Sequence, residues 1–271
     1  MNLGHIKTEP DATPSVHSAR DNLIYRTPEL ERYFSQNRIQ WCQFYESERR
    51  TIEKVWPGGC PTVLDVGCGC GGLGRALEER FGAVRYTGVE INADAAAAAS
   101  DVNPKAKVLT GDFLRMGRNE IEDNSFDMVI SLSCIDWNLT FAEMLRKAWS
   151  KVRADGTFVA SLRLTTEVGR DDISESYQYI NYDGNLEGEI APYVVLNATD
   201  LMRQVLSLGS VGRVYGFGYY GPPGKTAVTP FDKLCFAVLA LHKSPKTEPV
   251  EIELMLPEEI SKPMLDVCTQ S

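Results

Sequence analysis

The sequence predicts an α/β protein built on a seven-stranded, mostly parallel sheet with an antiparallel last strand and helices on both faces. Three observations predict this class. Short apolar runs alternate with segments of helical periodicity between residues 60 and 163, the pattern of βαβ units with right-handed crossovers. A glycine-rich turn follows the first apolar run. The last two apolar runs have no helix between them, which predicts an antiparallel hairpin at the end of the sheet.

Composition excludes several other classes. The chain has 271 residues, 43% of them hydrophobic and 24% charged, so collagen-like, coiled-coil and wholly disordered proteins are excluded. The net charge is −9, which argues against a general nucleic-acid binder, because such a protein needs a basic face. No run approaches the roughly 20 apolar residues that span a bilayer, so we expect no membrane partner.

The cysteines and the N-terminus favour a cytoplasmic protein. The seven cysteines are scattered, and the one close pair, Cys68 and Cys70, lies in a glycine run without a second pair to complete a metal site. We therefore expect reduced thiols and no bound metal. The first 20 residues contain charges and two prolines and no apolar stretch, so no signal peptide is visible.

The elements before the sheet follow in order. Residues 1–27 are polar and predict a flexible tail. From Pro28, apolar residues recur at spacings of three and four, which predicts a helical cap over residues 28–56. Pro57-Gly58-Gly59 then ends the helical stretch.

Residues 60–163 form the predicted core of a single domain that spans residues 28–243. Strands are expected at Thr62–Val66, Val84–Val89, Lys107–Leu109, Phe126–Ser131 and Gly156–Leu162, and helices at Gly72–Arg80, Ala93–Ser100 and Thr140–Val152. In the last helix the apolar residues recur at i, i+3, i+4, i+7, i+8 and i+11, which is a stripe that faces a core.

The order changes after the fifth strand. Residues 164–198 lack clear periodicity and predict a lid or substrate-binding insertion. Residues 199–243 predict a helix with Thr199 as its N-cap, followed by the terminal hairpin Val211–Phe217 and Leu234–Leu241. Residues 244–271 contain four prolines and predict an extended C-terminal tail.

The glycine run Val63–Gly72 is the strongest functional signal. Its glycines permit a tight turn and a close approach of backbone to a ligand, with a helix beginning at about Gly72. The spacing satisfies both G-x-G-x-G and G-x-G-x-x-G, so the ligand is not identified by the glycines alone, and a plain strand-to-helix turn remains an alternative. Asp65 ends the preceding strand, and a carboxylate there suits an ammonium group better than a pyrophosphate.

The run Val63–Gly72, together with Glu90 at the end of the next strand, resembles the first two motifs of class I S-adenosylmethionine-dependent methyltransferases, which have a Rossmann-like fold. Gly111-Asp112-Phe113 and the strand Phe126–Ser131 resemble the third and fourth motifs. The resemblance implies that S-adenosylmethionine is the cofactor. It also implies cofactor-binding roles for Asp65, Gly67, Cys68, Gly69, Glu90, Ile91, Asp112, Phe113 and Ser131.

In that family Asp65 would face the methionine portion, Glu90 the ribose hydroxyls, and Asp112 the adenine amino group beside Phe113. Glu90 follows Gly67 by 23 residues, close to the roughly 20 expected when the acid ends the next strand. For Asp112, a turn after a strand is the alternative interpretation.

Candidates for catalysis and substrate binding follow the fourth and fifth strands. Asp136 is the candidate catalytic base, Trp137 could wall the substrate pocket, and Asn138 could donate a hydrogen bond. Alternatively, Asp136 or Asn138 only caps the next helix. A buried Arg163 should meet an anion, either on the substrate or on an internal partner such as Asp136. The tyrosines of the irregular segment could form a lid with polar tips, and Tyr177 is the candidate for substrate binding; the others are Tyr179, Tyr182 and Tyr193.

The positive charge of Arg26 and Arg38 could lie over the pocket. Tyr33, Trp41 and Tyr45 of the cap could close its other side, and core packing is the alternative for all three. The three histidines lie in the tail or at the end of the last strand, so a histidine base is not expected.

These features predict methyl transfer from S-adenosylmethionine to an oxygen or nitrogen of a small molecule. A surface-glycan or nucleotide-sugar intermediate and a natural-product intermediate are the two acceptors considered. The alternatives are a catalytically silent cofactor-binding module and a nicotinamide-dependent oxidoreductase. No nucleic-acid partner is expected, and the oligomeric state is left open, a homodimer included.

Overall fold

The computed structural model describes residues 22, 24, 27, 30–181, 183–244 and 249–269, and of residues 30 and 31 it describes the backbone alone. Most of the expected tail 1–27, including Arg26, lies outside the described residues. Within the described ranges, every helix is too short or too polar to cross a membrane.

The central sheet is mostly parallel and has nine strands among the described residues, in the order β12-β9-β11-β5-β4-β1-β2-β3 with β8 paired to β5. The antiparallel pairs are β5 with β11 and β11 with β9. Its strands are β1 (Thr62–Val66), β2 (Arg85–Glu90), β3 (Lys107–Thr110), β4 (Phe126–Ser131), β5 (Val152–Thr165), β8 (Leu196–Asn197), β9 (Val211–Gly221), β11 (Leu234–Lys243) and β12 (Glu251–Met255).

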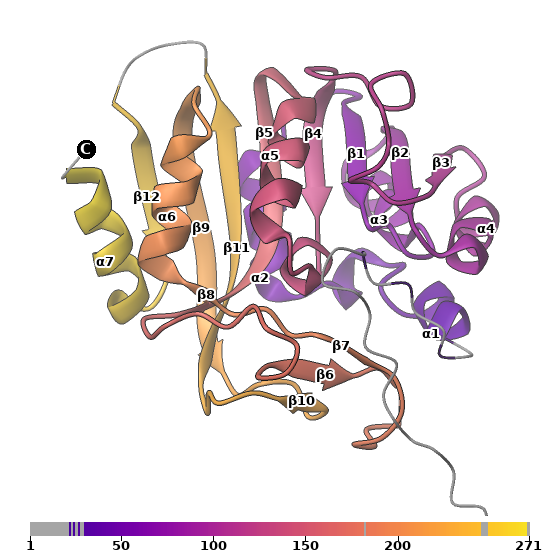
Figure 1. Ribbon diagram of the computed structural model, residues 1–271. Coiled ribbons are helices and arrows are strands. Elements are labelled where there is room, and N and C mark those ends of the chain that lie inside the picture. The colour runs from indigo at the N-terminus through magenta and orange to yellow at the C-terminus, as the bar shows by residue number, and fades with distance from the viewer. Residues whose placement is uncertain are drawn as a thin grey trace, which may run out of the picture.

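Helices cover both faces of this sheet, as the sequence predicts; α5 and α6 lie in front of it and α2 and α3 behind it in Figure 1. The helices are α1 (Leu30–Gln36), α2 (Glu46–Val55), α3 (Gly72–Phe81), α4 (Ala93–Val102), α5 (Phe141–Lys151), α6 (Ala198–Ser207) and α7 (Glu258–Thr269), with short 3-10 turns η1 (Trp41–Gln43) and η2 (Ile135–Trp137).

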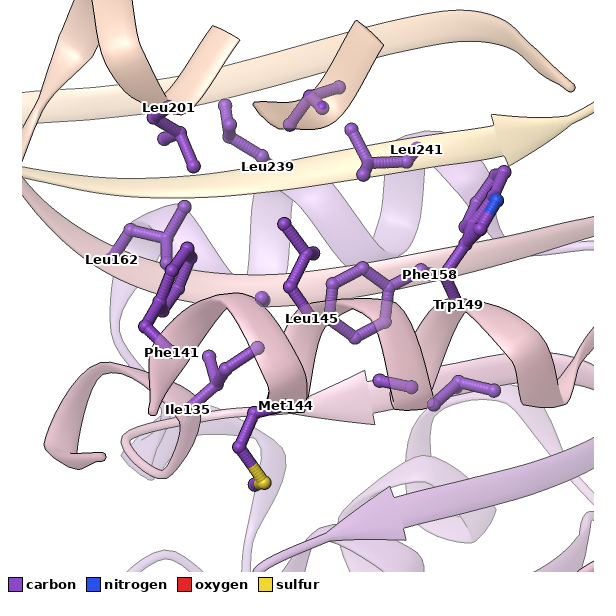
Figure 2. Packing of buried hydrophobic residues seen from close by; sticks show 14 of the residues in the cluster. Ile135, Phe141, Met144, Leu145, Trp149, Phe158, Leu162, Leu201, Leu239 and Leu241 are labelled. Atoms are coloured by element: carbon purple, nitrogen blue, oxygen red, sulfur yellow. The ribbon is translucent and has the colours of Figure 1, made fainter. Parts of the chain in front are cut away.

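Alternation along the strands divides the apolar residues between two cores. In β1, Leu64 and Val66 belong to the core under α5, α6 and α7, whereas Val63 belongs to the core under α2 and α3. Figure 2 shows the first core, where the stripe of α5 that includes Phe141 and Leu145 packs against the strands. Successive side chains of a strand point to opposite faces, so a strand covered on both sides is apolar throughout.

Two strands of the sheet were not expected. Strand β8 has two residues, too few to show any periodicity. Strand β12 lies in the part predicted to be an extended tail, and it pairs in parallel with β9, from Glu251 opposite Arg213 to Met255 opposite Phe217. After β12, helix α7 buries Ile260 and Met264 in the first core. The expectation of an extended C-terminal tail is therefore wrong for residues 251–269.

Helix α6 begins two residues earlier than expected. Asn197 is its N-cap, because the Asn197 side chain accepts a hydrogen bond from the Asp200 backbone amide at 3.0 Å. Thr199, the predicted cap, lies inside the first turn. Asparagine and threonine are both good N-cap residues; Asn197 is also the last residue of β8, so the strand leads directly into the helix.

The insertion after β5 forms a small sheet together with the loop between β9 and β11. Strands β6 (Tyr177–Tyr179), β7 (Ile190–Pro192) and β10 (Ala227–Val228) pair antiparallel in the order β10-β6-β7. This three-stranded sheet lies beyond the carboxyl ends of β1 and β4, below them in Figure 1, with α1 on the other side of the same edge. The predicted cap and the predicted insertion thus flank one edge of the central sheet.

Candidate functional site

A cavity of about 530 Å³ lies at the carboxyl ends of β1, β2 and β4. Its volume is within the range of small-molecule sites, and open parallel sheets bind ligands at this edge. Most of its lining comes from the loops after the strands, from the N-terminal cap, and from the segment Gln178–Asn181 of the insertion.

The glycine run lines one end of the cavity. Gly67 and Gly69 both have left-handed backbone conformations, with φ of +76° and +51°, which glycine adopts without strain. A Cβ on Gly67 would lie 2.4 Å from Cys134 Sγ, whereas a Cβ on Gly69 would meet no atom within 4 Å. Gly69 therefore presents its backbone to open space, where a ligand can approach it.

Asp65 lies at the end of β1 with 3% of its surface exposed, and it lines the cavity. The Tyr86 hydroxyl donates a hydrogen bond to Asp65 Oδ2 at 2.5 Å. Burial raises the pKa of the Asp65 carboxyl to about 7, against the lowering effect of that hydrogen bond. A cation in the cavity would favour the ionised form.

Glu90 ends β2 and joins the two loops that border the cavity. Its Oε2 accepts a hydrogen bond from the Gly69 amide at 2.8 Å, and its Oε1 accepts one from the Asn92 amide at 2.9 Å. Burial raises the pKa of this carboxyl, although these backbone amides oppose the shift. Each oxygen retains a second acceptor site, so the carboxylate can accept two hydroxyl groups from a ligand.

Asp112 and Ser131 are placed differently from the other predicted cofactor residues. Gly111 and Phe113 line the cavity, but Asp112 is absent from its described walls. Asp112 Oδ1 accepts hydrogen bonds from the Leu114 amide at 2.9 Å and from the Asn22 side-chain amide.

Ser131 is also missing from the walls. Its hydroxyl donates to the Val66 carbonyl at 3.3 Å and accepts from the Ile135 amide at 3.3 Å. The predicted residues that do line the cavity are Asp65, Gly67, Cys68, Gly69, Glu90, Ile91 and Phe113.

The candidate base Asp136 and the candidate anion-binding residue Arg163 pair with each other. Arg163 Nη2 lies 3.2 Å from Asp136 Oδ2, and each side chain is 6% exposed. Arg163 Nε also donates to the Val194 carbonyl at 3.1 Å. Neither residue lines the described cavity. The geometry therefore does not support Asp136 as the base or Arg163 as a ligand of the substrate. The internal partner that the sequence left open is the one observed.

The neighbouring candidates have mixed outcomes. Trp137 and Asn138 line the cavity, and Asn138 Oδ1 also accepts from the Thr140 amide at 2.8 Å, which fixes the turn before α5. Tyr177 does not line the described cavity, whereas Tyr179, two residues along β6, does. Of these two tyrosines, Tyr179 is the one placed to contact a ligand in the cavity.

The cap supplies walls that the sequence named only as open alternatives. Tyr33 and Tyr45 line the cavity, whereas Trp41 is buried in the core under α2 and α3. Arg38 also lines it. The cavity is also lined by residues that no sequence motif marks as functional, among them Asn22, Thr27, Phe34, Asn37, Phe44, Gln178, Ile180 and Asn181. Their spacing is that of ordinary amphipathic or irregular segments, which carries no information about a ligand.

The residues at the glycine end fit S-adenosylmethionine. A buried carboxylate at Asp65 suits its ammonium group, the two oxygens of Glu90 suit a pair of ribose hydroxyls, and Phe113 offers an apolar surface to a planar base. A pyrophosphate would meet the two acidic side chains at the same end, which is unfavourable. The donor and acceptor set therefore favours this cofactor over a dinucleotide.

Comparison with known proteins agrees with that chemistry. Residues 63–156 match the family model described as a methyltransferase domain. No curated protein matches the chain in sequence.

Two solved structures illustrate the structural likeness. Phosphoethanolamine N-methyltransferase 2 of Haemonchus contortus, in complex with S-adenosyl-L-methionine, is 15% identical over 85% of this chain and 61% of that one, with a TM-score of 0.56. An S-adenosylmethionine-dependent methyltransferase from Mesorhizobium loti is 14% identical over 73% of this chain and 98% of that one, with a TM-score of 0.51. At these identities the likeness concerns the fold.

The motif order, the mostly parallel sheet with its reversed strand and the matching domain over residues 63–156 agree with one another. Residues 63–156 are a methyltransferase domain, and the chain has the Rossmann-like fold of class I S-adenosylmethionine-dependent methyltransferases, with S-adenosylmethionine as its cofactor.

Proposed function

We propose that the protein transfers a methyl group from S-adenosylmethionine to an oxygen or nitrogen of a small molecule. The observation that carries this proposal is the single cavity of about 530 Å³ that the glycine loop, the cap and the insertion share. A site of that volume suits a cofactor and a small acceptor. The cap and the three-stranded sheet flank this edge of the central sheet and leave it as a cavity rather than an open face.

Within this proposal, Asp65 binds the ammonium group of the cofactor and Glu90 binds its ribose hydroxyls. The cofactor supplies a methyl group already activated on a sulfonium centre. The chain's own residues then have to hold the acceptor in line with that group, and such positioning can provide most of the acceleration. Trp137 and Tyr179 line the cavity from the loop after β4 and from β6, and we assign them to the acceptor.

The two carboxylates of the described walls, Asp65 and Glu90, are assigned to the cofactor, which leaves no side chain there to act as a base on the acceptor. These walls contain no histidine, and burial raises the pKa of the Cys134 thiol well above its usual range. A neutral amine has a free lone pair and can attack the methyl group without a base, and the ammonium product then releases its proton to water. The site therefore supports nitrogen, or an acidic hydroxyl, as the methylated group.

The charged side chains around the cavity also indicate which charge the acceptor carries. Arg163 is paired with Asp136, and Arg38 is the one Lys or Arg side chain among the described residues that line the cavity. A nucleotide-sugar, with two phosphates, would gain little from these walls. They favour an acceptor with few charges, such as a natural-product intermediate. We further propose a cytoplasmic location, which is supported by the seven cysteines, because all of them are thiols and none forms a disulfide in the described residues.

The direct test is transfer of an isotopically labelled methyl group to a panel of amines, phenols and nucleotide-sugars. We expect Tyr179→Ala and Trp137→Leu to raise KM for the acceptor at least several-fold and to leave the affinity for S-adenosylhomocysteine unchanged. Val168→Ala is the matched control, because Val168 is 74% exposed and does not line the described cavity.

Two results would contradict the proposal. Tight binding of S-adenosylhomocysteine without transfer to any acceptor class would favour a silent cofactor-binding module. Thermal stabilisation by a nicotinamide dinucleotide but not by S-adenosylhomocysteine would favour an oxidoreductase, because a ligand stabilises the fold only when it binds the native state.

A further inference from the structure

We propose that Arg38, in the N-terminal cap, binds the carboxylate of the cofactor's amino-acid end, opposite Asp65, which binds the ammonium group. The amino-acid end of S-adenosylmethionine is a zwitterion and needs one cationic and one anionic partner. Arg38 lies between α1 and η1, outside the matched residues 63–156. This assignment makes the cap a part of the cofactor site.

The backbone at Arg38 is held in an unusual conformation against the glycine loop. Its φ is +62°, in the left-handed region that residues with a Cβ rarely adopt. The Arg38 carbonyl lies directly over the start of α3, since a Cβ on Gly72 would be 2.2 Å from that oxygen. Glycine at position 72 is thus what allows the cap to approach the cofactor loop.

The guanidinium of Arg38 is held in place before any ligand arrives. Its Nη2 lies 2.8 Å from Glu48 Oε1, and the Glu48 side chain is 1% exposed. The guanidinium carbon lies 4.6 Å from the centre of the Phe44 ring and 5.4 Å from that of Tyr45. An arginine has five N–H donors, and this ion pair uses one nitrogen, so a second carboxylate can bind without moving the side chain.

The charges in the cavity favour the same assignment. Arg38 and Asp65 both line the cavity, and Arg38 is the one Lys or Arg among the described residues of its walls. The positive charge of Arg38 favours the ionised form of Asp65, and it therefore opposes the rise in the Asp65 pKa that burial causes. A carboxylate bound in this cavity therefore has one cationic partner available, and it lies near the carboxylate expected to bind the ammonium group.

An anionic acceptor could instead supply the carboxylate that Arg38 binds, and ligand pairs distinguish the two sources. S-adenosylhomocysteine contains the amino-acid end, whereas 5′-methylthioadenosine lacks it and keeps the nucleoside. We would measure the affinity of both ligands by calorimetry, without acceptor, for the natural protein, Arg38→Gln and Arg32→Gln. Arg32 is an exposed residue of α1 outside the described cavity walls, so Arg32→Gln is the matched control.

We expect Arg38→Gln to weaken S-adenosylhomocysteine binding by about 10-fold or more, the usual effect of losing a charge-assisted hydrogen bond. Binding of 5′-methylthioadenosine should stay within about twofold, and Arg32→Gln should change neither affinity. Equal weakening of both ligands would overturn the proposal and assign Arg38 to cap closure. Unchanged affinity for both, with a raised KM for an anionic acceptor, would assign the charge to the acceptor.

A second variant guards against unfolding, because Arg38→Gln leaves the buried Glu48 without its cationic partner. The double variant Arg38→Gln/Glu48→Gln removes both charges, so no buried charge is left without a partner, and it keeps the shape of the buried Glu48 side chain. It should bind 5′-methylthioadenosine like the natural protein and lose the preference for S-adenosylhomocysteine. Retention of that preference in the double variant would overturn the proposal even if the single variant does not fold.

Discussion

Arg163 and Asp136 form a buried ion pair, with 3.2 Å between Arg163 Nη2 and Asp136 Oδ2. The guanidinium carbon of Arg163 also lies 3.9 Å from the centre of the Tyr193 ring and 4.6 Å from that of Trp137. The pair therefore connects the loop after β4 to the insertion and holds Trp137, a wall of the cavity, in place. From this packing we infer that the ion pair positions Trp137.

We expect Asp136→Asn to reduce the free energy of unfolding by about 3–5 kcal/mol, because it leaves a buried arginine uncompensated. Urea denaturation measures the change. The matched control is Asp200→Asn, which breaks an exposed pair with Arg203 and should cost at most about 0.5 kcal/mol. A normal stability with abolished turnover would instead restore Asp136 as the catalytic base.

The pH dependence of stability should reveal Asp65. Its pKa is about 7 in the cofactor-free protein, compared with an ordinary value of 3.8. Because the folded state holds this proton more tightly than the unfolded state, stability should fall as the pH rises from about 4 to about 7.

Asp65→Asn should remove the part of this pH dependence of stability that Asp65 causes. Thermal unfolding measured from pH 5 to pH 8 checks this. Affinity for S-adenosylhomocysteine should rise over the same range in the natural protein, since ionised Asp65 attracts an ammonium group. A pH slope of the same size in Asp65→Asn would show that another group is responsible.

Substitution of Gly72 should separate the cap from the core. Because the new Cβ would lie 2.2 Å from the Arg38 carbonyl, Gly72→Ala should destabilise the protein by about 1–3 kcal/mol and weaken cofactor binding. Limited proteolysis should show faster cleavage in residues 30–56. The control is Gly117→Ala, whose Cβ would meet no atom nearer than 4.0 Å. Equal protease resistance in the two variants would argue against the close approach of the cap.

Helix α7 should contribute to the stability of the whole domain. Met264 is fully buried in the core shared with α6, whereas the adjacent Leu265 is 40% exposed. We expect Met264→Ala to cost about 2–5 kcal/mol and Leu265→Ala about 0.5 kcal/mol, as measured by urea denaturation. Similar small effects of both substitutions would mean that residues 258–269 are a dispensable tail.

Local patterns explain why the core of the fold could be predicted. The strand Thr62–Val66 is bounded by a proline and a glycine, and the stripe of α5 repeats at helical spacing. Strand β12 shows the limit of this reasoning. Its residues alternate between acidic and apolar, lie between two prolines, and pair with a strand 38 positions away in the chain. Nothing within the segment itself indicates that partner.

By itself, the sequence determined where most strands of the central sheet lie along the chain, the glycine loop, and the placement of Asp65 and Glu90 at two strand ends, because these depend on short-range spacing. The tertiary structure decided that Arg163 pairs with Asp136, that Tyr179 rather than Tyr177 lines the cavity, and that Arg38 lies beside the glycine loop. Such contacts join residues far apart in the chain, and packing and charge pairing in the folded state select them from many partners of the same residue types.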